Sequence, residues 1–271
     1  MLSTLARAAA RHALPAGGGL RSLSGAALEA AAAASSAPLP LGMSPETLEL
    51  AEAAHQFGAK EMAPHAARWD AESHFSVGTL KAAAEMGLGA LFVREDVGGS
   101  GLTRVDGAAI FEALSYHDVT HTAYLTIHNM NCWVIDTFGT EAQRQKWLPA
   151  LASMDRLSSY CLTEPGSGSD AASLSTSAVL SPDGSHYTLT GSKMFISGAG
   201  VADLYVVMAR TGAPGSGPGG VSCFVVEKGA EGLSFGPPEK KLGWCAQPTC
   251  AVSLDGVKVP AENMLGAEGE G

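Results

Sequence analysis

Apolar residues recur at intervals of three and four positions between about residues 43 and 156. This spacing places them on one side of a helix, so the pattern predicts a series of amphipathic helices. The first is expected to begin at Ser44, a suitable N-cap, with Pro45 in its first turn, and to be limited by Pro64. Its inward residues are expected to be Leu48, Ala51, Ala54 and Phe57.

Further helices are indicated by the same spacing and by residues that favour helix ends. They are expected over 76–87, 105–116, 121–138 and from residue 140 onward. Gly139 is placed to end the third of these, and Thr140 with Gln143 has the capping-box spacing that begins the fourth. The sequence therefore predicts an all-helical N-terminal domain over residues 41–156.

Short runs rich in β-branched and aromatic residues replace the helical pattern after about residue 157. The clearest are HYTLTG, KMFIS, LYVVMA, VSCFVVEK and TCAVSL. Turn residues separate them, as at 182–184 and in the Gly/Pro/Ser stretch 212–220. Strands that follow helices, rather than alternate with them, favour an α+β fold class with segregated domains. We therefore expect a small antiparallel β-sandwich or barrel over residues 157–271.

The first 28 residues differ in composition from the rest of the chain. Arg7, Arg11 and Arg21 lie among Ala, Leu, Ser and Gly, and the first acidic residue is Glu29. Such a basic, acid-poor segment is typical of an organelle presequence, and a disordered Ala-rich tail is the alternative. We expect residues 1–40 to be a mitochondrial presequence and disordered lead, and the mature protein to reside in the mitochondrial matrix.

The charge of the remaining chain restricts its partners. Without the first 28 residues it keeps 14 of its 17 basic residues and all 27 acidic ones, a formal charge of −13. A body this acidic disfavours nucleic acid and anionic membranes as partners, and no apolar stretch is long enough to span a membrane. A polyanionic ligand would therefore have to be held by local backbone N–H groups and hydroxyls.

The cysteines show no pairing or metal-binding pattern. They are Cys132, Cys161, Cys223, Cys245 and Cys250. An odd number without C-x-x-C spacing fits reduced thiols in a matrix-like compartment. Neither a structural zinc nor any other metal is expected, because four ligands at metal-binding spacing are missing.

One segment, SYCLTEPGSGSDAAS at residues 159–173, concentrates glycines and hydroxyl groups. Within it, GSGSDA fits the dinucleotide-binding pattern G-x-G-x-x-A. That pattern must end a strand and open a helix, whereas the residues that follow here are rich in Ser, Thr and Val and indicate strand. We therefore expect a polar loop whose backbone N–H groups at 166–170 face a phosphate, with a plain surface turn as the alternative.

The residues around this loop suggest what else it would hold. A flat heterocycle could lie on the strand end beside Thr163, and further along Phe195 and Ser197 place a ring and a hydroxyl on one face of a predicted strand. Aromatic surface combined with hydroxyl donors suits a flavin. An ordinary strand with a core phenylalanine fits the same residues equally well.

Other catalytic patterns find little support. The chain has neither a phosphate-binding G-x-x-x-x-G-K-[ST] loop nor an H-E-x-x-H motif. His117 and His121 are expected to be polar residues on a helix face. Glu164 and Asp170 could form a pair of carboxylates, but their spacing in a loop does not fix their geometry.

Five separated segments resemble the acyl-CoA dehydrogenase family, and they occur in the family's order. They are QFGAKEMAP, REDVGGSGL, YCLTEPGSGSDAAS, GSKMFISGAG and DGVKVPAENMLG. The resemblance extends from about Met43 to the last residue. The stretches AYLTIHNMNCWVIDTFG and LYVVMARTG are most similar to the branch that oxidises a short branched acyl-CoA, isobutyryl-CoA to methacrylyl-CoA, in valine breakdown.

The resemblance implies FAD as cofactor and two flavin-contact segments. The residues concerned are Tyr160, Cys161, Leu162, Thr163, Glu164, Pro165, Gly166, Ser167, Gly168 and Ser169 in the first, and Phe195, Ile196 and Ser197 in the second. Thr163 would lie near the reactive edge of the flavin. Gly168 and Ser169 would meet phosphate, and Ser169 would also touch the acyl-CoA. Phe195 and Ser197 stand where many members have Trp and Thr.

The resemblance also implies partners and a further domain. Electron-transfer flavoprotein would accept the electrons, and the complete family fold, which ends in a C-terminal helical bundle, forms homotetramers. The catalytic glutamate belongs to that bundle, which is expected to be absent because the chain stops at Gly271. No catalytic residue is therefore expected in this chain, which alone would be inactive. The alternatives are an inactive flavin-fold fragment and an oxygen-using acyl-CoA oxidase, which the presequence disfavours.

Overall fold

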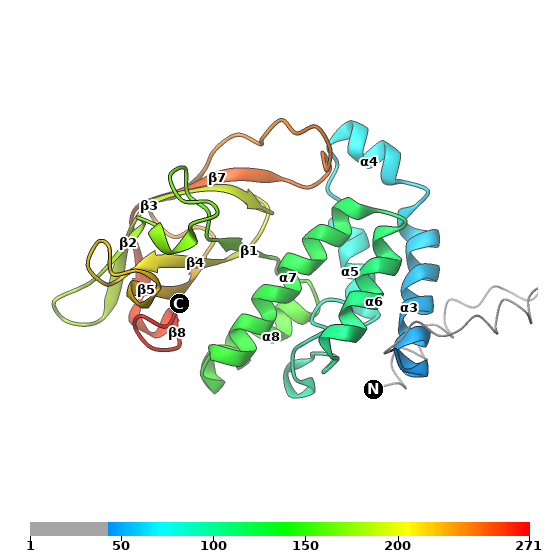
Figure 1. The fold of residues 1–271 in the computed structure, drawn as a ribbon, viewed down its shortest axis with the longest axis horizontal. Coiled ribbons are helices and arrows are strands. Elements are labelled where there is room, and N and C mark those ends of the chain that lie inside the picture. Colours follow the sequence, from blue (N-terminus) through cyan, green and yellow to red (C-terminus); the bar gives the residue numbers. More distant parts are fainter. Residues whose placement is uncertain (1–42) are drawn as a thin grey trace, which may run out of the picture.

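The computed structural model describes residues 43–271, so the expected presequence lies outside the described residues. Helices occupy the first part of this range and strands the second (Figure 1). The helices are α3 (Pro45–Phe57), the π-helix η1 (Gly58–Met62), α4 (Ala66–Glu72), α5 (Val77–Glu85), the 3₁₀ turn η2 (Glu95–Val97), α6 (Arg104–Ser115), α7 (Val119–Phe138) and α8 (Glu141–Ala152). The predicted order of helices followed by strands is confirmed.

The predicted helix starts agree with the observed caps. The Ser44 side chain accepts a hydrogen bond from the backbone N–H of Thr47, at 3.1 Å, and α8 begins with the capping box of Thr140 and Gln143. Ala54 and Phe57 are buried as predicted, whereas Thr47 and Leu50 take the buried places expected of Leu48 and Ala51. The cause is a contact outside the helix: the Thr47 hydroxyl donates to Asp106 at the start of α6, at 2.6 Å.

Helix α4 was not predicted. Its N-cap, His65, makes no side-chain capping bond, so local sequence gives no start signal. Tertiary packing holds it instead, because Trp69 is buried with its ring centroid 4.6 Å from that of His121. His121 is itself fully buried, which corrects its assignment to a polar helix face: its Nδ1 lies 2.5 Å from the Asp118 carboxylate, and its Nε2 accepts from the Ser76 N–H at 2.9 Å.

The strands form one eight-stranded sheet that is mostly antiparallel. They are β1 (Ser158–Cys161), β2 (Ser177–Leu180), β3 (His186–Ser197), β4 (Leu204–Arg210), β5 (Val221–Glu227), β6 (Leu233–Phe235), β7 (Thr249–Pro260) and β8 (Met264–Leu265). Their order is β6-β7-β3-β2-β4-β5-β8, and β1 pairs in parallel with β4. The parallel contacts bring the end of β1 beside the middle of the sheet.

The sheet curves so that its concave side encloses a core. Tyr187 on β3 and Phe224 on β5 have ring centroids 4.9 Å apart, although two strands separate β3 from β5 in the sheet. The register shifts twice along β3, after Leu189 and after Lys193, and such bulges increase the bend of a strand. Curvature therefore lets residues from both halves of the sheet bury one another.

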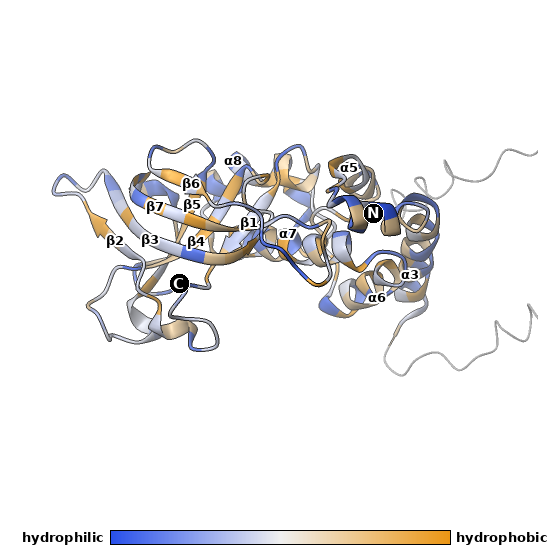
Figure 2. Cartoon of the chain, turned by 90° about the horizontal axis from the view of Figure 1, so that it is seen from above, coloured by the Kyte–Doolittle hydropathy of each residue, from blue (hydrophilic) through white to orange (hydrophobic). Residues whose placement is uncertain are grey.

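The two domains lie side by side along the long axis, with α7 and β1 at their junction (Figures 1 and 2). Tyr124 on α7 donates its hydroxyl proton to the Ser158 carbonyl on β1, at 3.0 Å. On α8, the Gln143 amide donates to the carbonyls of Glu262 and Met264, at 2.7 and 2.8 Å. These buried contacts attach the β domain to the last two helices.

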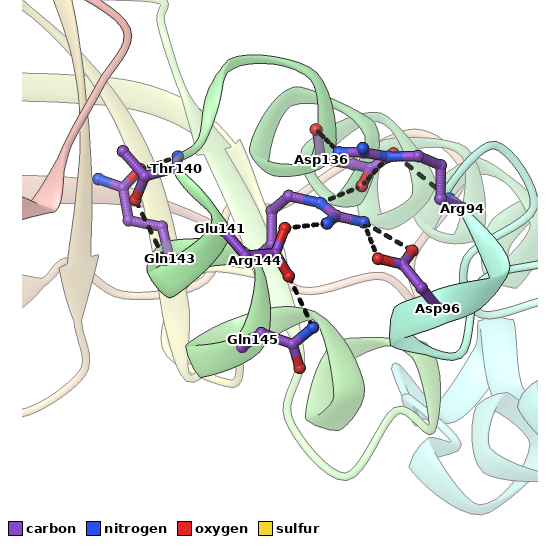
Figure 3. Close-up of polar contacts among 8 residues, drawn as sticks. All are labelled: Arg94, Asp96, Asp136, Thr140, Glu141, Gln143, Arg144 and Gln145. Carbon is purple, nitrogen blue, oxygen red and sulfur yellow. Dashed lines mark hydrogen bonds and ion pairs between the residues drawn. The ribbon is translucent and has the colours of Figure 1, made fainter.

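A cluster of charges ties η2, α7 and α8 together inside the helical domain (Figure 3). The Arg144 guanidinium is almost fully buried and donates to Asp136 at 2.7 Å, to both oxygens of Asp96 at 2.7 and 2.9 Å, and to Glu141. Arg94 also contacts Asp136, at 3.2 Å. Each donor of Arg144 thus meets a carboxylate, which is the condition for burying a guanidinium at tolerable cost.

The structure also describes the state of the cysteines and the character of the helices. All five cysteines are free. Among residues 43–271, no helix combines the length and the apolar character that crossing a bilayer requires.

Candidate functional site

The segment singled out in the sequence forms a tight loop at the end of β1. Glu164 and Ser167 exchange backbone hydrogen bonds, at 2.9 and 3.1 Å, and the Ser167 hydroxyl donates to the Asp170 carbonyl at 2.6 Å. This turn leaves Gly168 and Ser169 exposed, together with Pro165 and Gly166. A Cβ atom added at Gly166 or Gly168 would meet nothing within 4 Å. The backbone here is therefore open to a ligand.

The Glu164 side chain points away from that ligand face and anchors the loop. Its carboxylate accepts from Lys193 Nζ at 2.8 Å and from the backbone N–H groups of Ser175 and Thr176, at 2.7 and 2.9 Å. Burial acts to raise the pKa of Glu164, but the hydrogen bonds from Lys193, Thr176 and Ser175 outweigh it and lower the pKa to about 2. Glu164 thus stays ionised, with its charge compensated inside the protein.

Lys193 was missed by the sequence analysis, although it sits inside one of the quoted segments. Its side chain is fully buried, and Nζ also donates to the Leu162 carbonyl at 3.1 Å. The backbone N–H of Met194 donates to the Thr163 carbonyl at 2.8 Å. These bonds bring the two predicted flavin-contact segments, 160–169 and 195–197, side by side.

Phe195 departs from ordinary strand geometry. Its φ is +59°, a left-handed conformation that is uncommon for a residue with a side chain, and the residue is 59% exposed. The preceding bulge in β3 separates the pair Lys193–Val252 from the pair Ile196–Cys250. Ile196 is buried, so the bulge turns the neighbouring aromatic ring outward. A large apolar ring held in solvent by a strained backbone indicates a surface for a ligand.

The end of β3 is held against the helical domain. Gly198 has a φ of +78°, and a Cβ atom there would lie 2.5 Å from the Tyr124 ring, so only glycine fits. The Ser159 hydroxyl donates to the Ser197 carbonyl at 2.7 Å. Ser197 is thereby fixed at the domain junction, beside the exposed ring of Phe195.

The other residues that were predicted to contact the flavin fall into two groups, those that line a surface hollow and those that are buried inside the domain. Tyr160 and Leu162 line a small hollow of about 150 Å³, whereas Cys161 is fully buried, which raises the pKa of its thiol to about 12 and leaves it unreactive. Neither Asp170 nor Glu164 lines this hollow. Among residues 43–271, no three His, Cys, Asp or Glu side chains gather in a way that could hold a metal ion.

A larger groove of about 460 Å³ adjoins the loop. Its walls are the stretches 172–179 and 210–217, and it shares Ala172 and Leu174 with the small hollow. Arg210 is its only charged lining residue. The sequence analysis did not identify this wall, because the two stretches meet only in the folded sheet.

The donor set matches the requirements of a flavin nucleotide. An exposed ring and the hydroxyl-bearing residues Thr163 and Ser197 can meet a flat heterocycle, and the open backbone at 166–169 can meet phosphate. Of the two acids in the loop, Glu164 is neutralised by Lys193, whereas Asp170 is exposed and accepts from the Ser173 hydroxyl. The residues present therefore fit the group that the sequence resemblance implies.

Comparison with known proteins agrees with this geometry. The profile of the acyl-CoA dehydrogenase N-terminal domain matches residues 44–155, and that of the middle domain matches residues 159–257. The mitochondrial isobutyryl-CoA dehydrogenase of Bos taurus is 55% identical over 231 residues, which are 85% of this chain and 55% of that protein. The chain thus spans about half the length of this relative.

Solved structures show the same fold. Butyryl-CoA dehydrogenase from Megasphaera elsdenii superposes with a TM-score of 0.80 at 33% identity, covering 86% of this chain and 61% of that one. An acyl-CoA dehydrogenase from Bacillus anthracis, complexed with FAD, gives a TM-score of 0.76 at 36% identity, covering 86% and 39%. On these matches, together with the arrangement of the two loop segments, the chain belongs to the acyl-CoA dehydrogenase family.

Proposed function

We propose that residues 160–169 and 195–197 provide the flavin-contact surface of an FAD-dependent acyl-CoA dehydrogenase. The observation that carries the proposal is the exposed ring of Phe195, held in a left-handed bulge beside an open glycine-rich loop. Bound FAD would accept the β-hydrogen of the substrate as hydride, and the protein's contribution is to bind and orient the reactants. The relative from Bacillus anthracis was solved with FAD, which supports this choice of cofactor.

Each residue of the surface has a defined task in this proposal. Phe195 offers its ring to the heterocycle, while Thr163 and Ser197 offer hydroxyls at its edge. The N–H groups near Gly168 and Ser169 hold phosphate, and Ser169 also touches the thioester ligand. Tyr160 and Leu162 complete the wall, and Glu164 acts through its bond to Lys193.

The substrate we propose is a short branched acyl-CoA, namely isobutyryl-CoA. Support comes from the 55% identity to a protein that carries this activity in its name. Titration calorimetry on the FAD-loaded chain tests the choice, with isobutyryl-CoA and a straight-chain acyl-CoA of eight carbons as the two ligands. We expect tighter binding of isobutyryl-CoA, and equal or inverted affinities would reject the assignment.

We further propose that residues 1–271 alone do not catalyse dehydrogenation. No Asp or Glu side chain lines either hollow beside the loop, and Glu164 is committed to its ion pair with Lys193. A positioned base typically contributes about 10²–10⁴-fold to such a reaction. The assay uses isobutyryl-CoA with an artificial electron acceptor. Turnover comparable to that of a complete dehydrogenase would show that a carboxylate within this chain acts as the base.

Partners and location follow from the same family assignment. We propose electron-transfer flavoprotein as the electron acceptor, homotetramers for the complete family fold, and the mitochondrial matrix as the compartment. The Bos taurus relative is a mitochondrial protein, which supports the compartment. A fusion of residues 1–40 to a reporter should enter mitochondria, and replacing Arg7, Arg11 and Arg21 with Gln should leave it in the cytosol.

A further inference from the structure

The end of β4 carries an arginine that joins two loops. Arg210 is only 8% exposed. Its Nε donates to the Leu174 carbonyl at 3.0 Å, and its Nη2 donates to the Ala172 carbonyl at 2.6 Å. On the other side, Nη1 donates to the Ser216 hydroxyl at 2.9 Å and to the Gly217 carbonyl at 3.1 Å. One guanidinium therefore bridges the continuation of the flavin-contact loop and the glycine-rich loop after β4.

This arginine differs from Arg144 in its counter-charges. Arg144 meets three carboxylates, whereas Arg210 forms no ion pair with any carboxylate among residues 43–271. Burying a cation without an opposite charge is costly, even when carbonyl groups accept its hydrogen bonds. The groove beside Arg210 has no acidic lining residue that could offset this free-energy cost. An arginine kept there despite the cost indicates a role in addition to holding the fold together.

Each loop also has bonds of its own: Glu164 accepts from the N–H groups of Ser175 and Thr176, and the Gly220 carbonyl accepts from those of Thr211 and Gly212. Residues 171–173 form a single 3₁₀ turn without a side-chain cap. In the other loop, Gly215 and Gly217 have φ angles of +81° and +68°, which glycine adopts without the steric cost that other residues meet. The backbone of Arg210 is itself fixed, because its N–H donates to the Thr176 carbonyl at 2.7 Å. The guanidinium thus ties both loops to the end of β4.

We propose that Arg210 is a positioning residue for ligand binding. The planar guanidinium of Arg210 sets the spacing between the stretches 172–174 and 216–217, which face each other across the 460 Å³ groove. It thereby sets the affinity for the coenzyme A thioester. This step rests on the proposed function, because the thioester is the ligand that the groove would receive. Four hydrogen bonds of the Arg210 guanidinium go to protein groups. Arg210 therefore affects ligand binding through the two loops that it holds.

The test compares Arg210→Met, Arg210→Lys and a matched control, Arg68→Met, which changes an exposed arginine on α4. Hydrogen exchange of the unliganded chain, read by mass spectrometry, reports on the loops, and calorimetric titration with coenzyme A reports on binding. In Arg210→Met we expect faster exchange at 171–175 and 212–220 with unchanged exchange in β3 and β7. We also expect about tenfold weaker binding of coenzyme A, the effect of losing charge-assisted hydrogen bonds.

Lysine keeps the positive charge but lacks the planar guanidinium with its several fixed N–H donors. The exchange rates and the coenzyme A affinity of Arg210→Lys should therefore lie between those of the wild type and Arg210→Met. Unchanged exchange of the two loops in Arg210→Met overturns the proposal, as does wild-type affinity for coenzyme A. Faster exchange spread over the whole β domain also overturns it, since the arginine would then serve the fold in general. A wild-type chain that does not bind coenzyme A contradicts the proposed function and the ligand role, while the exchange data still decide whether Arg210 holds the loops.

Discussion

Two buried charge clusters in this molecule are built in opposite ways. In the β domain, Glu164 and Lys193 expose 4% and 0% of their side chains, so neither partner reaches water. In the helical domain, Arg144 is 2% exposed, but its partners Asp96 and Glu141 are 50% and 65% exposed. The first cluster is closed, and the second reaches solvent through its carboxylates.

The difference shows how burial determines the cost of losing a partner. In the closed cluster, removing one charge leaves the other without either a counter-ion or water, which is the costly case. In the open cluster, an unpaired carboxylate returns to solvent, and surface ion pairs contribute only about 0–1 kcal/mol. The closed pair lies under the loop 163–170, so the stability of this loop and the shape of the candidate site depend on the same contact.

The largest effect is expected from Glu164→Gln. This change leaves the Lys193 ammonium buried without its carboxylate and should lower the free energy of unfolding by about 3–5 kcal/mol. Urea denaturation followed by circular dichroism measures it. The matched control is Asp96→Asn, the same carboxylate-to-amide change in the open cluster, which should cost clearly less because Asp96 is half exposed and Arg144 keeps Asp136 and Glu141. Equal losses in the two variants would contradict the distinction.

The next largest effect concerns pH. His128 is fully buried, its Nδ1 accepts from the Ser158 N–H at 3.2 Å, and its Nε2 donates to the Leu151 carbonyl at 3.0 Å. Burial lowers the pKa of His128 from 6.5 to about 4, so between these values the unfolded chain binds a proton that the folded chain does not. Stability should therefore fall by about 3 kcal/mol as the pH drops from about 6.5 to 4.

This pH window is separate from that of the closed cluster. The pKa of Glu164 is lowered from 4.5 to about 2, so its contribution is complete above pH 4.5 and is lost as the pH falls toward 2. Unfolding free energies measured from pH 7 to pH 3, for the wild type and His128→Gln, distinguish the two groups. The variant should lack the decline between pH 6.5 and 4, and an unchanged decline would remove His128 as its source.

A moderate effect is expected from Arg144→Met. The change removes the centre of the open cluster, but Asp136 keeps its contact with Arg94, and Asp96 and Glu141 reach water. We expect a loss of about 2 kcal/mol, measured as for Glu164→Gln. A loss as large as that of Glu164→Gln would mean that solvent does not relieve this cluster, and the comparison would fail.

The smallest effect on stability is expected at Phe195, where stability and binding should move in opposite directions. Phe195→Gly relieves a left-handed conformation and should raise the free energy of unfolding by about 1 kcal/mol, whereas Phe195→Ala should leave it nearly unchanged. Both variants lose the ring and should retain less FAD after gel filtration, read from flavin absorbance per protein. Wild-type retention of FAD in both would exclude Phe195 from the cofactor surface.

Local sequence predicted those features that depend on neighbouring residues. The caps at Ser44 and Thr140 bond residues three positions away, so their spacing alone identifies them. The partner of Glu164 lies 29 positions along the chain, and no local pattern shows that the two meet. The left-handed backbone of Phe195 likewise depends on a bulge against β7, which exists only once the two strands have paired.

Titration of the chain with FAD, followed by amide chemical shifts, tests the central claim most directly. The account predicts that the shifted amides are those of residues 160–169 and 195–197, with smaller changes along 172–179. Phe195→Ala should weaken the response at every one of these positions, because the heterocycle loses its aromatic contact. Shifts confined to other parts of the chain, or no shifts at millimolar FAD, would contradict the assignment of this surface to the flavin.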